Sequence, residues 1–89
     1  MLDFRVIDIS LDGSRVALRD SRGALHVARS EARSLRLHDE LNGARARLGP
    51  HLLLRRQSPR GLAVVFEHVD CGQIVALEVL HDRAIGVRL

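Results

Sequence analysis

Lysine, tryptophan and tyrosine are absent from this 89-residue sequence, and Phe4 and Phe66 are its only phenylalanines. A surface that stacks nucleic-acid bases on aromatic side chains is therefore not expected, and nucleic acid is a disfavoured partner. Leu, Val, Ile and Ala must supply most of the hydrophobic core. A hydrophobic content of 46% beside 28% charged residues is typical of a folded domain and excludes a disordered chain.

Cysteine is nearly as scarce, because Cys71 is the only one. A disulfide within the chain is therefore excluded, and a reducing, cytoplasmic location is expected. The longest uninterrupted apolar run, Leu62–Phe66, is far too short for a membrane span. The charged residues near the N-terminus do not resemble a signal peptide.

The length and charge of the chain predict a single binding domain that covers residues 1–89. A core of this size is thin, so docking onto a protein partner or pairing into a homodimer is expected. All 14 cationic side chains are arginines, and the net charge is +3. Arginine pairs well with phosphates, carboxylates and guanine edges, but these arginines are spread along the chain and form no basic tail.

Six short segments alternate between apolar and polar residues, as β-strands with one buried face do. They cover residues 2–9, 15–19, 25–27, 40–48, 51–57 and 62–69, with a bulge expected near Val6 and Ile7. Asp12-Gly13 and Gly23 predict tight turns between the first three segments. Residues 58–61, Ser-Pro-Arg-Gly, predict a turn that closes a hairpin between the last two.

The C-terminal part predicts one helix and a last edge strand. Residues 73–81 form the helix, although several β-branched residues leave a strand as the alternative. The apolar side chains expected on its barrel side are Ile74, Val75, Leu77 and Leu80. Residues 84–89 are predicted to form the edge strand. Together these elements predict a mostly β fold, either a small antiparallel β-barrel or a sandwich, with a C-terminal helix.

The segment Asp8-Ile9-Ser10-Leu11-Asp12-Gly13 carries the candidate site. The carboxylate of Asp8 can accept the two N–H donors of a guanine edge. Ser10 adds a hydroxyl group, and Gly13 permits a close backbone approach with positive φ. The alternative is purely structural, because Asp and Ser beside Asp-Gly also hydrogen-bond the backbone of a turn.

This D-x-S-x-x-G pattern resembles a signature of PilZ domains, small split β-barrels that bind the bacterial messenger cyclic di-GMP. Residues 61–67, Gly-Leu-Ala-Val-Val-Phe-Glu, followed by the predicted helix, look like the closing strand and C-terminal helix of that family. Residues 53–56 are similar to the strand that pairs with it. The resemblance implies a PilZ-like split barrel, with Asp8, Ser10 and Gly13 contacting cyclic di-GMP or shaping its surface.

The sequence departs from the family at its N-terminus. Ligand-binding PilZ domains carry R-x-x-x-R upstream of D-x-S-x-x-G, whereas Arg5 is the only arginine before Asp8. Pairs with this spacing occur downstream about as often as the arginine content yields by chance. Each lost charge-assisted hydrogen bond costs roughly 1.5–3 kcal/mol, so losing two weakens binding roughly several hundredfold or more. The resemblance therefore favours a degenerate PilZ-like adaptor that acts through protein contacts in bacterial signalling or motility. The alternative is a cyclic di-GMP receptor with Arg5 as substitute cation.

Other chemistries find little support in the sequence. His68 and Cys71, with Asp70 between them, come closest to a metal site, but no second pair of ligands matches them. No phosphate-binding loop, nucleophile elbow or paired carboxylates are present, so an enzyme is not expected. An oligonucleotide-binding barrel is a further alternative, which the scarcity of aromatic residues disfavours.

Overall fold

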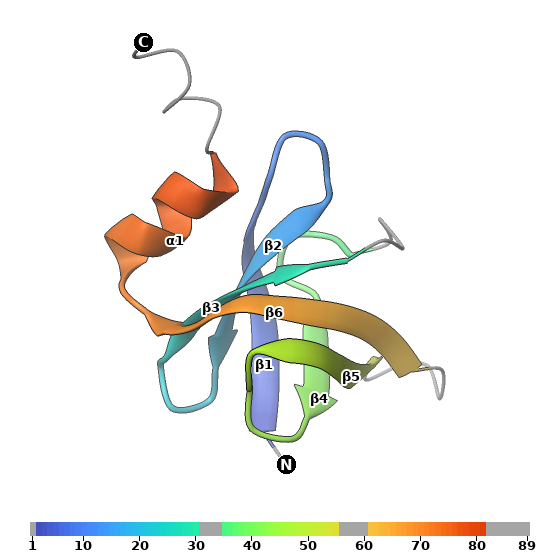
Figure 1. Ribbon diagram of the computed structural model, residues 1–89. Helices are drawn as coiled ribbons and strands as arrows, with labels where there is room; N and C mark the ends of the chain where they lie inside the picture. The colour runs from blue at the N-terminus through green and yellow to red at the C-terminus, as the bar shows by residue number, and fades with distance from the viewer. Residues whose placement is uncertain (1, 31–34, 56–60, 82–89) are drawn as a thin grey trace, which may run out of the picture.

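The computed structural model describes residues 2–30, 35–55 and 61–81. Six strands in these residues form a closed barrel in the order β1-β2-β3-β6-β5-β4, and every neighbouring pair is antiparallel (Figure 1). The elements are β1 (Leu2–Ile9), β2 (Arg15–Asp20), β3 (Leu25–Arg29), β4 (Glu40–Gly43), β5 (Gly49–Arg55), β6 (Gly61–Cys71) and α1 (Gln73–Leu80). The predicted mostly β, antiparallel barrel is confirmed. The predicted edge strand at 84–89 and most of the turn at 58–61 lie outside the described residues.

The core of the barrel is filled by the inward side chains of all six strands. Phe4 and Phe66 lie at its centre, with ring centroids 6.1 Å apart, and both are buried. Small and branched residues fill the rest of the cluster: Val6, Val16, Leu18, Ala28, Leu35, Leu41, Ala46, Leu53, Leu62 and Val64. Because both phenylalanines are buried here, neither offers its ring to a ligand at the surface.

A bulge in β1 changes which side chains face outward. The register with β2 shifts between Val6 and Asp8, as the sequence predicts. Ile7 packs with the residues on the outer side of β2 and β3, and Asp8 then pairs with Ala17 on that same side. Ile9 returns to the core. The bulge therefore turns Asp8, which simple alternation would point inward, to the outside of the barrel.

Strand β4 is shorter than the alternation at residues 40–48 predicts, and that prediction is wrong beyond Gly43. A Cβ atom at Gly43 would lie 2.5 Å from Cδ2 of the buried Leu53. Only glycine allows β4 to approach the core this closely. Past this point the chain leaves the ladder, and β5 begins at Gly49.

Helix α1 covers one side of the barrel, over β2 and β3 (Figure 1). Ala76 and Leu80, four residues apart, face the same way and pack on Ala17 and Val27. Val75 was expected on the barrel side, but it is 43% exposed, because one helical step turns it away from the contact with the barrel. No helix among the described residues has the length and apolar character needed to cross a membrane.

Candidate functional site

The hairpin between β1 and β2 holds the predicted motif, and Ser10 organises it. Its buried hydroxyl group accepts a hydrogen bond from the backbone N–H of Arg15 at 3.0 Å and donates one to Asp12 Oδ1 at 2.8 Å. The backbone N–H of Gly13 donates to the Ser10 carbonyl at 2.9 Å, and Gly13 has a φ of 76°. Ser10 and Gly13 therefore both stabilise the turn itself.

Asp12 completes this hairpin. Its Oδ1 accepts hydrogen bonds from the hydroxyl and the backbone N–H of Ser14, at 2.7 and 3.0 Å. These bonds, with the one from Ser10, hold the pKa of Asp12 well below its usual range. Asp12 thus stays ionised and bonded to the turn.

Asp8 is the member of the motif whose carboxylate reaches beyond the hairpin. Oδ1 accepts a hydrogen bond from the backbone N–H of Ile9 at 2.9 Å. Oδ2 lies 3.2 Å from Nε2 of His81, just after α1, and both side chains are about one-third exposed. Asp8 therefore links the hairpin to the end of the helix.

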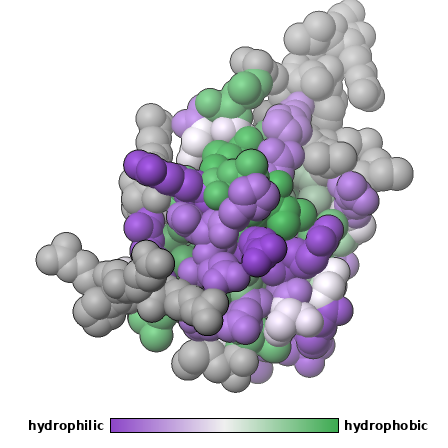
Figure 2. Space-filling model, turned by 180° about the vertical axis from the view of Figure 1, so that it is seen from behind, coloured by the Kyte–Doolittle hydropathy of each residue, from purple (hydrophilic) through white to green (hydrophobic). Residues whose placement is uncertain are grey.

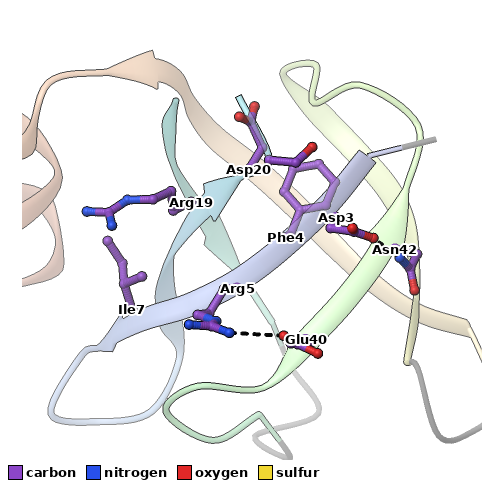
Figure 3. A pocket seen from close by; sticks show the side chains of 9 residues that line it. Asp3, Phe4, Arg5, Ile7, Arg19, Asp20, Glu40 and Asn42 are labelled. Atoms are coloured by element: carbon purple, nitrogen blue, oxygen red, sulfur yellow. Dashed lines mark hydrogen bonds and ion pairs between the residues drawn. The ribbon is translucent and has the colours of Figure 1, made fainter. Parts of the chain in front are cut away.

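Arg5 lies on the outer face of β1, in a polar depression of about 450 Å³ between β2 and β4 (Figure 3). Its guanidinium group is paired with Glu40 at 3.0 Å, and Arg19 is its partner in the ladder with β2. The structure thus gathers Asp8, Ser10 and Gly13 in one hairpin and bonds Arg5 to a different strand, β4.

A buried polar network that the sequence analysis missed lies at the β2–β3 turn. The side chains of Asp20 and His26 are both fully buried, and Asp20 Oδ2 lies 2.8 Å from His26 Nε2. Asp20 Oδ1 accepts hydrogen bonds from the backbone N–H groups of Arg22 and Ala24. Burial raises the pKa of Asp20, but the hydrogen bonds from His26, Arg22 and Ala24 outweigh it and hold the pKa at about 2, below the ordinary 3.8.

The chemistry of this network fits a structural role better than a metal site. Asp20, His26 and Asp70 bring their ligand atoms close together. However, the backbone N–H of Asp70 donates to His26 Nδ1 at 3.0 Å, so Nε2 carries the proton that Asp20 accepts. The guanidinium group of Arg22 also lies 3.1 Å from Asp20 Oδ2 and 3.6 Å from Asp70 Oδ1. Arg22 therefore supplies the cation, and neither ring nitrogen of His26 has a free lone pair.

Cys71 does not have the environment of a reactive thiol. Its side chain packs against the cluster between α1 and the barrel, and burial raises the pKa of the thiol group. The sulfur lies 3.5 Å from the carbonyl oxygen of Leu25. Cys71 acts here as a small packing residue.

The outer side of the β5–β6 hairpin carries a continuous apolar surface. Three cross-strand pairs make up this surface, which we call the apolar face: Pro50–Val65, Leu52–Ala63 and Leu54–Gly61. Leu52 is 61% exposed, and the surface around it has a depression of about 840 Å³. Seen from behind, the molecule carries mostly hydrophilic residues around a central hydrophobic area (Figure 2).

The barrel and these surfaces define a small β-barrel domain with an outward-facing apolar hairpin. Compared with known proteins, the chain matches no family model, no curated protein and no solved structure.

The signals for the features missed at first were present in the sequence. Asp20 shares the parity of Val16 and Leu18, which indicates an inward side chain, but the turn chemistry of Asp-Ser-Arg-Gly obscured it. The apolar face is visible as Leu52 and Leu54 on the side of β5 opposite the buried Leu53. Three consecutive leucines cannot all face one core in a strand.

Proposed function

We propose that this chain is a PilZ-like binding adaptor that acts through contact with another protein. The apolar face is the observation that carries the proposal. Six residues without a charged side chain are directed outward on β5 and β6, and Leu52 at their centre is mostly exposed. An exposed apolar patch of this kind is typical of an interaction surface.

The bonding of the motif hairpin supports an adaptor over a receptor for cyclic di-GMP. Ser10 uses its hydroxyl group as donor and acceptor within the turn, and Arg5 is paired with Glu40. A guanine edge would have to compete with His81 for Asp8. The partly exposed carboxylate of Asp8 is the feature that keeps the receptor as the second candidate.

Peptide display tests the adaptor. A library of random peptides is selected against the wild-type protein and against Leu52→Asp. Leu11→Asp is the matched control, because Leu11 is 68% exposed but lies in the motif hairpin. We expect peptides that bind the wild-type protein and Leu11→Asp alike and bind Leu52→Asp at least about tenfold more weakly. Peptides insensitive to Leu52→Asp, or no selected peptides, would contradict the proposal.

Titration calorimetry with cyclic di-GMP tests the second candidate separately. The adaptor predicts no measurable heat at high ligand concentration. Micromolar or tighter binding that is lost in Asp8→Ala would establish the receptor instead.

A further inference from the structure

Two sides of the barrel carry outward-facing apolar residues, and among the described residues only one of these sides is covered by a helix. On β2 and β3, Ala17 and Val27 are covered by Ala76 and Leu80 of α1. On β5 and β6, the apolar face carries residues of the same kind, and none of the described residues covers Leu52. The barrel thus already binds one helix on an outer apolar face and presents a second such face.

Among the described residues, Arg29 places a positive charge beside the apolar face. Arg29 lines the depression and is the ladder partner of Val65, which places it at the border of the face. Within residues 2–30, 35–55 and 61–81, no hydrogen bond or ion pair of the exposed Arg29 side chain is found. Glu67 follows Val65 on the same side of β6, but it is bonded to Arg15 at 2.7 Å. An occupant of the face would therefore gain most by bringing a carboxylate to Arg29.

The shape of the face suits inserted side chains. Gly61 and Ala63 are small, and Leu52 lies across Gly61, with its Cδ1 2.7 Å from the position that a Cβ atom would take there. Strand β6 pairs with β5 along residues 61–66 and with β3 along residues 65–71. A partner that lies on the apolar face makes its contacts through side chains, as α1 does on Ala17 and Val27.

From these observations we propose, on the basis of the adaptor function above, that the apolar face binds an acidic amphipathic helix of another protein. Apolar side chains of that helix pack around Leu52, and an acidic residue beside its apolar stripe pairs with Arg29. A second copy of this chain fits less well, because its own apolar face is bordered by Arg29, and the chain as a whole has a net charge of +3.

Charge reversal at Arg29 tests this inference. A library of amphipathic helical peptides, with varied residues beside a constant apolar stripe, is selected against the wild-type protein and against Arg29→Glu. Arg19→Glu is the matched control, since Arg19 is also exposed but lies on β2. We expect Asp and Glu to be enriched in the wild-type and Arg19→Glu selections, and Lys and Arg in the Arg29→Glu selection. A peptide selected on the wild-type protein should bind Arg29→Glu about tenfold or more weakly.

The outcomes separate this inference from the adaptor function. Peptides that depend on Leu52 but show no acidic preference and no response to Arg29→Glu would overturn the acidic helix and leave the adaptor standing. If no selected peptide depends on Leu52, both the acidic helix and the adaptor function are overturned. Sedimentation tests whether a second copy of the chain occupies the apolar face, and vesicle binding tests whether a membrane surface does. A dimer abolished by Leu52→Asp, or binding of anionic lipid vesicles abolished by it, would replace the helix with a second copy or a membrane surface.

Discussion

Ser10 lies at the end of β1, where one hydroxyl group joins two parts of the hairpin. It accepts from the Arg15 backbone and donates to Asp12. Replacement by alanine leaves a partly buried N–H without this acceptor, so Ser10→Ala should lower the free energy of unfolding by about 1–2 kcal/mol. Ser21→Ala, an exposed serine in the next hairpin, is the control and should change little. Urea unfolding followed by circular dichroism measures both, and equal stability of the two variants would contradict the structural role.

Asp20 makes the free energy of unfolding depend on pH in the acid range. Its pKa is lowered from 3.8 to about 2 in the folded protein, so the unfolded chain binds the proton more readily. The stabilisation, about 2 kcal/mol, is therefore fully present above about pH 5 and is lost as the pH falls toward about 2. Asp20→Asn should be less stable than the wild-type protein by this amount at neutral pH and approach it in acid. Urea unfolding at several pH values measures the difference, and a constant difference would show that Asp20 does not act through its charge.

Two strands, β4 and β6, each contain a glycine where a larger side chain would meet a leucine of β5. A methyl group at Gly43 would meet the fully buried Leu53, and one at Gly61 would meet the exposed Leu52. Leu53 cannot move away, whereas Leu52 can rotate toward solvent. Gly43→Ala should therefore cost about 1–3 kcal/mol and Gly61→Ala much less. Thermal unfolding compares them, and the reverse order would contradict the packing described for β4.

The contact of α1 with the barrel gives a second matched pair. Ala76 packs on Ala17 and Val27, and its neighbour Val75 is 43% exposed. Ala76→Glu buries a charge under the helix or displaces α1, so it should destabilise the protein by at least about 2 kcal/mol. Val75→Glu should have little effect. Similar melting temperatures for the two variants would show that α1 does not pack on the barrel in this way.

For the whole molecule, local patterns in the sequence predict a mostly β fold, a barrel or a sandwich, and the resemblance to PilZ domains favours the barrel. Alternation located the strands and Asp-Gly located a turn. Even the bulge near Val6 followed from two adjacent apolar residues. The end of β4 could not be predicted, because the close approach of Gly43 to Leu53 is set by strands far apart in sequence.

The candidate site was less predictable, because its residues divide between roles that sequence patterns do not separate. Asp-x-Ser before Asp-Gly serves turn bonding and ligand binding equally well, and only the bonds of Ser10 show its use in the turn. Arg5 could not be assigned to Glu40 until the pairing of β1 with β4 was known. The apolar face likewise depends on which side of β5 meets the core.

We propose that the molecule binds a protein partner through the apolar face of β5 and β6. An NMR titration of the labelled protein with a peptide selected on it, following each backbone amide, tests this contact. We expect the largest shifts on residues 51–54 and 61–65. Shifts centred on residues 8–14 of the motif hairpin, with those of β5 and β6 unchanged, would contradict it.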